Sequence, residues 1–366
     1  MRKGWEYKKL GDLCDIYQPK TLATEQLVAD GKYYVYGANG IIGRYNDYNH
    51  EQSEILLTCR GATCGTINIS QPYSWINGNA MVIHRKSEDL SFDFLKYLML
   101  SLDYSLIITG AAQPQITRQK IAPIIVKFPS LSVQQYIVSE LDKINELIRL
   151  KKEQLKDYDN LAQSIFYEMF GDPVVNEKGW EVKKLGELCV SKLKYGSGAS
   201  AVDFDGNIRY VRITDINEDG TLNNDIKSPN IVDDEYLLNV GDIVFARSGA
   251  TVGKTYLHRK NNIKCLYAGY LIKATLNTKM ALPIYVFQFT QSKYYKDWVN
   301  LNARAVAQPN INAKQYGDLQ IPLPPLTLQQ VFAQRIELIE QQKAEIQSTI
   351  ADLETLLASR MQYWFD

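Results

Sequence analysis

The segment Leu131-Ser132-Val133-Gln134-Gln135 is followed 195 residues later by a similar segment, Leu326-Thr327-Leu328-Gln329-Gln330. Each segment lies just after a proline and opens a stretch of about 40 residues without an internal proline or glycine. Stretches of this length without helix breakers are typical of single long helices. The sequence therefore predicts helices over residues 131–171 and 326–366, each extending at least roughly 55 Å at about 1.5 Å per residue.

Apolar residues recur along both predicted helices at alternating steps of four and three. Nine of ten such positions in the first helix, and eight of ten in the second, hold residues that can be buried. This period of about 3.5 residues is typical of helices that pack along their length. Two unrelated amphipathic helices are the alternative, but the similarity extends beyond them. The positions are Ile137, Leu141, Ile144, Ile148, Lys151, Leu155, Tyr158, Ala162, Ile165 and Met169, then Phe332, Ile336, Ile339, Lys343, Ile346, Ile350, Leu353, Leu357, Arg360 and Trp364.

The chain also repeats itself outside the helices. Residues 4–14 recur as 179–189 at an offset of 175, and residues 55–65 recur as 243–253 at an offset of 188. The motif Gln113-Pro114-Gln115-Ile116 recurs as Gln308-Pro309-Asn310-Ile311 at an offset of 195. Matching anchors predict a shared scaffold, and the unequal stretches between them predict surface loops that carry function. We therefore expect a globular part, a helix, a second globular part and a second helix.

Composition limits the class of protein. A chain of 366 residues is long enough for two or three domains. Its 41 basic residues balance 41 acidic ones, which taken alone argues against a nucleic-acid binder. The charges are not evenly distributed along the chain. Residues 1–130 hold 14 basic and 12 acidic residues, and residues 172–325 hold 19 basic and 16 acidic residues. The first predicted helix holds 5 basic and 7 acidic residues, and the second holds 3 basic and 6 acidic residues. Mildly basic globular parts and acidic helices favour DNA on the former and protein partners elsewhere.

The sequence contains no long apolar run and no apolar leader segment, so we expect neither a membrane span nor secretion. The five cysteines form no CxxC pair, and reduced thiols in a cytoplasmic protein are expected. Short strands are predicted in the globular parts at residues 55–58, 242–246, 82–84, 270–273 and 121–128. One helix is predicted in each globular part, at residues 92–102 and 283–298. This pattern indicates an α+β fold class.

Two motifs resemble catalytic sites but do not meet their requirements. The segment from Gly249 to Thr255 resembles a phosphate-binding P-loop, yet three residues rather than four separate its glycines, and its counterpart from Gly61 to Thr66 lacks the lysine. A tight glycine turn, whose backbone amides can approach a DNA phosphate, is the better interpretation. The Glu-x-Lys segments at Glu6 and Glu181 contain half of a nuclease motif. The better interpretation is that each forms the first strand of its globular part.

The remaining chemistry-bearing residues give no catalytic pattern. His50, His84 and His258 are isolated from cysteine pairs and acidic clusters, so no metal site is expected. The 24 tyrosines gather with Asn, Arg and Gly between the anchors, notably in residues 32–48 and 209–215. Arg, Asn, Gln and Lys read base edges, while Tyr and backbone amides hold phosphates. Protein-binding surfaces are also rich in tyrosine, so composition leaves DNA and protein partners equally open.

Taken together, these features resemble the specificity subunit of type I restriction-modification enzymes over nearly the whole chain. The resemblance implies target recognition domains over residues 1–130 and 172–325. It also implies that helices 131–171 and 326–366 pack as an antiparallel coiled coil between them, in a pseudo-twofold internal repeat. It rests on the Gly-Trp-x-x-x-Lys-Leu-Gly segments at Trp5 and Trp180, the stretch from Tyr36 to Gly43, the turns after Arg60 and Arg247, the Gln-Pro-x-Ile motifs, and the Leu-x-x-Gln-Gln helix starts.

The resemblance further implies that each domain reads one half of a bipartite, asymmetric site in double-stranded DNA. The helices would set the spacing and dock two modification subunits, which supply S-adenosylmethionine and methylate adenine N6. Restriction (translocase) subunits would add cleavage driven by ATP and Mg²⁺. The chain itself would be non-catalytic and hold no cofactor. The alternatives are an adaptor that binds only proteins and dimerises through its helices, and a self-sufficient nuclease or ATPase.

Candidate DNA contacts lie in the loops and at the anchors of both domains. Arg60 and Arg247 belong to the anchors, so we expect them to touch the DNA backbone rather than bases. The candidates are Asn39, Arg44, Tyr45, Arg60 and Gln113 in the first domain, and Arg209, Arg212, Arg247, Lys254, Arg304 and Asn310 in the second.

The sequence predicts that Arg212→Ala changes or abolishes the choice of the second half-site, because arginine is the commonest reader of guanine. Mapping methylated sites in cells that contain the chain and its methyltransferase checks this. Methylation weakened equally at all sites would instead identify Arg212 as a phosphate contact.

Overall fold

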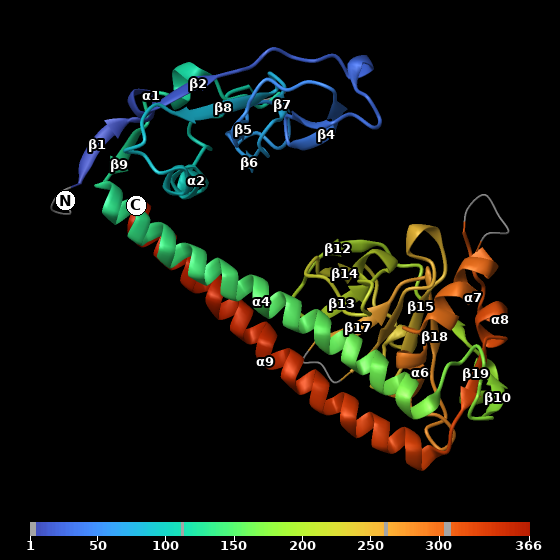
Figure 1. Cartoon of the computed structure of the whole chain (residues 1–366). Helices are drawn as coiled ribbons and strands as arrows, with labels where there is room; N and C mark the ends of the chain where they lie inside the picture. The colour runs from blue at the N-terminus through green and yellow to red at the C-terminus, as the bar shows by residue number, and fades with distance from the viewer. Residues whose placement is uncertain (1–4, 111–112, 260–262, 304–308) are drawn as a thin grey trace. The chain divides into compact units, whose positions relative to one another are not determined.

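The computed structural model describes residues 5–110, 113–259, 263–303 and 309–366. By its internal contacts the chain divides into two compact units. The first unit comprises Met1–Leu150 and Ile350–Asp366, and the second comprises Lys151–Thr349. Each unit therefore contains one globular part together with a segment of each long helix (Figure 1).

In the first unit, the globular part is built mainly from short strands. Its elements are β1 (Glu6–Lys9), α1 (Leu10–Leu13), β2 (Cys14–Tyr17), η1 (Thr24–Gln26), β3 (Tyr33–Gly37), β4 (Gly40–Tyr45), β5 (Ile55–Thr58), β6 (Ile67–Ile69), β7 (Trp75–Ile76), β8 (Ala80–Arg85), α2 (Phe92–Ser101), α3 (Arg118–Ile121) and β9 (Ile125–Phe128). The first long helix, α4 (Leu131–Phe170), follows.

In the second unit, the same order recurs with additional short elements. They are β10 (Glu181–Lys184), α5 (Leu185–Leu188), β11 (Lys194–Tyr195), β12 (Ala201–Asp203), β13 (Ile208–Val211), η2 (Ile213–Asp215), β14 (Lys227–Pro229), η3 (Asp234–Tyr236), β15 (Ile243–Ala246), η4 (Gly249–Thr251), β16 (Thr255–Leu257), β17 (Lys264–Tyr267), β18 (Leu271–Ala274), α6 (Pro283–Phe289), α7 (Lys293–Ala303), α8 (Ala313–Gly317) and β19 (Gln320–Leu323). The second long helix is α9 (Leu326–Phe365).

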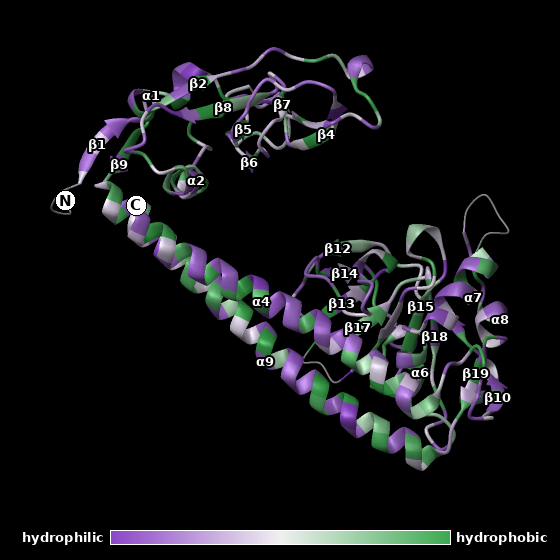
Figure 2. Ribbon diagram, viewed as in Figure 1, coloured by the Kyte–Doolittle hydropathy of each residue, from purple (hydrophilic) through white to green (hydrophobic). Residues whose placement is uncertain are grey.

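A four-stranded antiparallel sheet lies at the centre of each globular part. Its strand order is β2-β8-β5-β6 in the first unit and β11-β18-β15-β16 in the second. All four residues of β5, and all four of β15, are buried, and β15 and β18 appear hydrophobic in Figure 2. A parallel pair, β3 with β7 or β13 with β17, lies beside each sheet. The predicted mixture of strands and helices is thus observed in both repeats.

Each globular part closes where its long helix begins. Strand β1 pairs antiparallel with β9, with Glu6 opposite Phe128, and β10 pairs with β19, with Glu181 opposite Leu323. The two Glu-x-Lys segments are therefore first strands, as expected. The cysteines that follow them, Cys14 and Cys189, are repeat counterparts, and burial raises the pKa of both thiols to about 12.

The long helices α4 and α9 each span 40 residues, and both show mixed hydrophilic and hydrophobic residues in Figure 2. All the predicted apolar-stripe positions are buried or half-buried. In the second unit, Phe332 contacts Phe166 at 5.9 Å between ring centroids, and Lys343 Nζ lies 2.6 Å from Asp159 Oδ1. In the first unit, Arg360 Nε lies 2.5 Å from Glu140 Oε1. The helix segments also join the globular cores, where Ile137 and Phe332 are fully buried.

The predicted helix over residues 283–298 is wrong in one respect. It consists of two helices, α6 and α7, separated at Thr290–Ser292. The Thr290 hydroxyl donates to the carbonyl of Phe287, and the buried Ser292 hydroxyl accepts from the amide of Tyr295. Serine and threonine commonly cap or end helices in this way. The first-unit helix, predicted over 92–102, is observed as α2.

A buried glutamine ties each long helix to its globular part. Gln134 accepts a hydrogen bond from the amide of Ser91 and donates to the carbonyls of Asp89 and Pro129, at 2.8–2.9 Å. Its counterpart Gln329 accepts from Leu282 and donates to Met280 and Pro324, at 2.8–3.2 Å. Both side chains are fully buried. The second residue of each Gln-Gln pair, by contrast, is exposed.

We predict that Gln329→Ala lowers the free energy of unfolding of the full chain by about 2–4 kcal/mol, because it leaves buried backbone groups without partners. Urea denaturation monitored by circular dichroism measures the change. The neighbouring Gln330→Ala is the matched control, and a change below about 0.5 kcal/mol is expected there. Equal effects of the two substitutions would contradict the assigned role.

Candidate nucleic-acid interface

A glycine turn bonded to the Gln-Pro-x-Ile motif occurs in both units with the same hydrogen bonds. In the first unit, the amide of Gly61 donates to the carbonyl of Pro114 at 3.0 Å, and the amide of Ile116 donates to the carbonyl of Cys59 at 3.0 Å. In the second unit, the amide of Gly249 donates to the carbonyl of Pro309 at 3.1 Å, and the amide of Ile311 donates to the carbonyl of Arg247 at 2.8 Å. Gly61, Gly65, Gly249 and Gly253 all have positive φ, which explains the need for glycine. The prediction of tight glycine turns is confirmed.

The arginines at these turns are not structural counterparts. Arg60 forms an isolated bridge with Gln115, whereas Ser248 forms the equivalent bridge with Asn310. Arg247 therefore occupies the position of Cys59, one residue earlier. Neighbouring residues of an extended chain point to opposite sides, so the two repeats display their arginines differently beside the same turn.

In the first unit, three candidates lie on the exposed surface around the turn. Arg60 and Gln113 are exposed. Asn39 is also exposed, and it accepts a hydrogen bond from Asn68 at 3.0 Å. The hydroxyl of Thr58, at the end of β5, donates to the carbonyl of Ala38 and so holds the β3–β4 turn near the glycine turn.

The other two first-unit candidates pack within the β3–β4 hairpin. The Arg44 guanidinium lies over the ring of Tyr34, 4.3 Å from its centroid, and donates to the carbonyl of Gly31 at 3.2 Å. Tyr45 contacts Trp75 edge-on at 5.5 Å. Both side chains are half-buried. These contacts stabilise the hairpin that carries Asn39.

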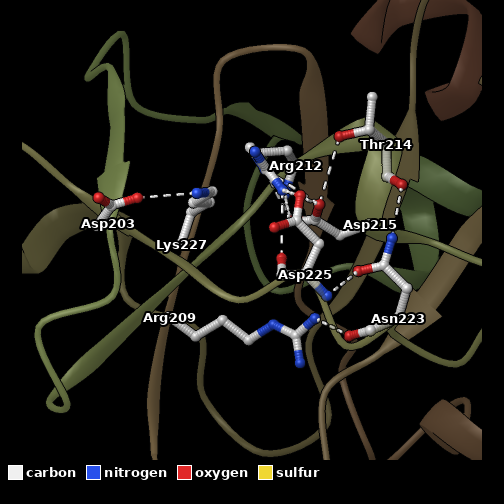
Figure 3. Close-up of polar contacts among 8 residues, drawn as sticks. All are labelled: Asp203, Arg209, Arg212, Thr214, Asp215, Asn223, Asp225 and Lys227. Carbon is white, nitrogen blue, oxygen red and sulfur yellow. Dashed lines mark hydrogen bonds and ion pairs between the residues drawn. The ribbon is translucent and has the colours of Figure 1, made fainter. Parts of the chain in front are cut away.

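In the second unit, Arg212 is the centre of an ion-pair network (Figure 3). Its Nε and Nη2 donate to Asp215 Oδ1 at 3.0 and 2.6 Å, and Nη2 also donates to Asp225 Oδ2 at 2.9 Å. The Asp215 side chain is fully buried, and a fifth (21%) of the Arg212 side chain is exposed. Hydrogen bonding to Arg212 lowers the pKa of the Asp225 carboxyl below its usual range. Arg212 therefore orders the loop that follows β13.

Three further second-unit candidates lie at or near the glycine turn. The Arg247 guanidinium stacks on Tyr195 at 4.8 Å, and Arg247 Nε donates to Asn310 Oδ1 at 3.4 Å. Asn310 is exposed. Lys254 Nζ lies 2.9 Å from Glu218 and donates to the carbonyl of Ile216, so it fastens the turn to a neighbouring loop. This engagement disfavours a phosphate-binding lysine of the P-loop kind.

The last two candidates, Arg209 and Arg304, are not part of this exposed surface as the structure describes it. Arg209 is only 9% exposed, and its Nη2 donates to the carbonyl of Asn223 at 2.6 Å. Arg304 lies outside the described residues.

Sequence reasoning did not select several residues that shape the interface. The i,i+3 spacing of Arg212 and Asp215 was an available signal. No local pattern pointed to Tyr195 or Asn68, because each meets its partner across a long separation in the chain.

Within the described ranges, no group of three or more His, Cys, Asp or Glu residues is arranged to hold a metal ion. Among the helices of those ranges, none combines the length and apolar character that crossing a bilayer requires.

Comparisons with known proteins place these features in a family. The sequence profile of the family described as type I restriction modification DNA specificity domain matches residues 2–157 and 177–354. A protein named as a type I specificity subunit in Mycoplasma pneumoniae is 26% identical over 204 residues, which cover 54% of this chain and 54% of that protein. The match thus spans about half the length of that relative. The specificity subunit of the type I restriction enzyme MjaVIII from Methanocaldococcus jannaschii is 21% identical over 380 residues, covering 92% of this chain and 86% of that one.

The fold is also similar to a solved structure. The crystal structure of the S subunit of a type I restriction-modification system from M. genitalium covers 99% of this chain and 96% of its own, with 16% identity and a TM-score of 0.56. The duplicated α/β scaffold is therefore of the type I specificity-subunit class. The chain belongs to the family of type I restriction modification DNA specificity domains. The resemblance inferred from the sequence is confirmed.

We predict that Arg212→Ala lowers the free energy of unfolding by about 2–4 kcal/mol, because it strips the buried Asp215 carboxylate of its bidentate partner. Thermal and urea unfolding of the full chain measure the change, and adding Asp215→Asn should restore part of the loss.

The control for this prediction is Lys227→Ala in the same network. Lys227 pairs with Asp203, whose side chain is fully exposed, so a loss below about 1 kcal/mol is expected. If Arg212→Ala leaves the free energy of unfolding unchanged, the main role of Arg212 is not structural. That result would favour the prediction that Arg212 reads bases.

Proposed function

We propose that this chain is the sequence-specific DNA-recognition subunit of a type I restriction-modification complex. Each globular part reads one half of a bipartite, asymmetric site in double-stranded DNA. The observation that carries the proposal is the family membership, together with a repeated scaffold whose loops differ. Identical scaffolds suit two similar tasks, and unlike loops suit two different half-sites.

The DNA-contacting surface in this proposal surrounds the two glycine turns. Asn39, Arg60 and Gln113 in the first unit, and Arg247 and Asn310 in the second, combine exposure or partial exposure with side chains that read base edges or hold phosphates. The structural contacts of Arg44, Tyr45, Arg212 and Lys254 would hold these readers in place. Fixed supports of this kind reduce the loss of side-chain freedom on binding.

The long helices would act as an antiparallel coiled coil that sets the distance between the two domains. A helix of 40 residues extends about 60 Å at 1.5 Å per residue. Half-sites one helical turn apart are separated by about 34 Å, so the helices are long enough for this task. Their excess of acidic residues would favour partner subunits with basic surfaces.

The partners would be two modification subunits and restriction (translocase) subunits in the cytoplasm. S-adenosylmethionine, ATP and Mg²⁺ would bind to those subunits, and this chain would be non-catalytic. The contacts of Lys254 with Glu218 and Ile216 agree with a structural role for the glycine turn.

The test is to map N6-methyladenine genome-wide in cells that contain the chain and its methyltransferase partner. A single bipartite asymmetric motif is expected. Asn39→Ala should relax recognition in one half of the motif only, and Asn310→Ala in the other half only, because each lies in a different unit. A mismatched base pair typically costs about 1–3 kcal/mol, or roughly fivefold to 150-fold in selectivity.

Arg335→Ala, an exposed position on α9, is the matched control and should leave the motif unchanged. Sequence-independent methylation, or no selective retention of duplexes in gel-shift experiments with the partner, would leave the protein-only adaptor as the better explanation.

A further inference from the structure

A cavity of about 270 Å³ lies in the second unit, between the globular part and the long helix α9. Three cationic side chains line it: Arg209 from β13, Arg259 from the chain after β16, and Lys343 from α9. Glu340 and Asp219 also line it, and Phe287 contributes an apolar wall. These lining residues all belong to the second unit and lie within its described ranges.

Arg209 is the unusual member of this set. Its side chain is more than nine-tenths buried, and its Nε is a buried donor without a hydrogen-bond partner. Its Nη2 donates a hydrogen bond to the backbone carbonyl of Asn223 at 2.6 Å (Figure 3). Within the described residues it forms no ion pair. In addition to the hydrogen bond from Arg212, the charge of Arg209 helps to lower the pKa of the nearby Asp225 carboxyl, but Asp225 forms its ion pair with Arg212. A buried charge without an ion-pair partner is costly unless a ligand supplies one.

The two neighbouring cations are already paired. Arg259 lies 2.8 Å from Glu340, and Lys343 lies 2.6 Å from Asp159. The rim carboxylate of Asp219 accepts hydrogen bonds from the amide and hydroxyl of Thr221, at 2.9 and 2.7 Å. The lining thus combines three cationic with two anionic side chains, and Arg209 is the cation among them that makes no ion pair within the described residues. Burial raises the pKa of the Tyr256 hydroxyl in the cavity wall, while the charges of Arg209 and Arg259 act in the opposite direction.

The first unit replaces every one of these cations by a neutral residue. At the end of the parallel pair of strands, the carbonyl of Val211 in β13 and the carbonyl of Tyr36 in β3 accept equivalent backbone hydrogen bonds. Val211 and Tyr36 are therefore counterparts, and two residues earlier Tyr34 corresponds to Arg209. Strand β16 pairs with β15 in the same register as β6 pairs with β5, so Gln71 corresponds to Arg259. In the helix repeat, Ile148 corresponds to Lys343. The cations thus occur together in one repeat and are absent together from the other.

We propose that the Arg209 cavity binds a small oxyanion of the phosphate class, held by the guanidinium of Arg209 with Arg259 and Lys343 beside it. Guanidinium groups bind phosphate oxygens through paired N–H donors, and the buried Nε of Arg209 is a donor without a hydrogen-bond partner. The anion would join the globular part of the second unit to the helix segment that carries Lys343. The same chemistry could come from a free phosphate or from a phosphate of the DNA backbone, and the experiment separates these sources.

The test measures the thermal midpoint of the full chain in rising inorganic phosphate, with chloride at matched ionic strength as the baseline. A ligand that binds only the folded state raises the midpoint by roughly 3–5 °C for each tenfold increase above its dissociation constant. Arg209→Met should abolish this phosphate-specific rise. Arg209→Lys, which keeps the charge but loses the paired donors, should retain a smaller rise.

Matched variants keep the outcome interpretable. Arg335→Met removes an exposed arginine and should respond like the unaltered chain. Should Arg209→Met fail to fold, Arg259→Met at the half-exposed rim should reduce the response at least severalfold. An equal phosphate response in the unaltered chain and in the Arg209 and Arg259 variants would overturn the proposal. A chain that neither phosphate nor a DNA duplex stabilises more than chloride does would overturn it as well.

A parallel titration with a short DNA duplex identifies the source of the anion. Stabilisation by phosphate that Arg209→Met removes supports a free anion. Stabilisation by the duplex but not by phosphate, again removed by Arg209→Met, supports a backbone phosphate. Because the phosphate arm contains no DNA, its failure is distinguishable from failure of the proposed recognition function.

Discussion

A single buried amide at the start of each long helix joins that helix to its globular part. Gln134 and Gln329 each accept one backbone hydrogen bond and donate two. Only an amide side chain offers an acceptor and two donors on one short, uncharged group. Its partners lie just before the globular helix and just before the long helix, so the amide fixes the direction in which the long helix leaves its own globular part. The apolar residues that follow, such as Ile137 and Phe332, then complete the globular cores.

The repeats share a scaffold but use it differently. Both units keep the antiparallel sheet, the paired first and last strands, and the glycine turn bonded to the Gln-Pro-x-Ile motif. In the second unit, the insertion ahead of β15 contains η2 and β14 and holds the Arg212 network. In the first unit, the same region forms the β3–β4 hairpin, packed by Arg44 and Tyr45. Surface loops tolerate such changes because they contribute little to the cores.

Much of this architecture was predictable because it depends on local signals. The ends of the long helices, the strands at residues 55–58 and 243–246, and the glycine turns all follow from periodicity, breakers and positive-φ requirements. The break between α6 and α7 was missed because Ser292 acts as a helix cap only through its own side chain, which the surrounding apolar pattern concealed. The partners of the arginines were unpredictable for a different reason. Arg247 meets Tyr195, 52 residues away in sequence, and Arg259 meets Glu340, contacts that no local pattern encodes.

The sequence by itself determined the duplication, the two long helices, the family, and the residue types available for binding, because each depends on spacing along one chain. Only the tertiary structure decided which candidates remain exposed. It buried Arg209 in a cavity against the helix segment, engaged Arg212 with a buried carboxylate, and left Asn39, Arg60 and Asn310 at the surface. The physical reason is that exposure and ion pairing depend on segments distant in sequence, and a charged side chain has no fixed role until folding sets its neighbours.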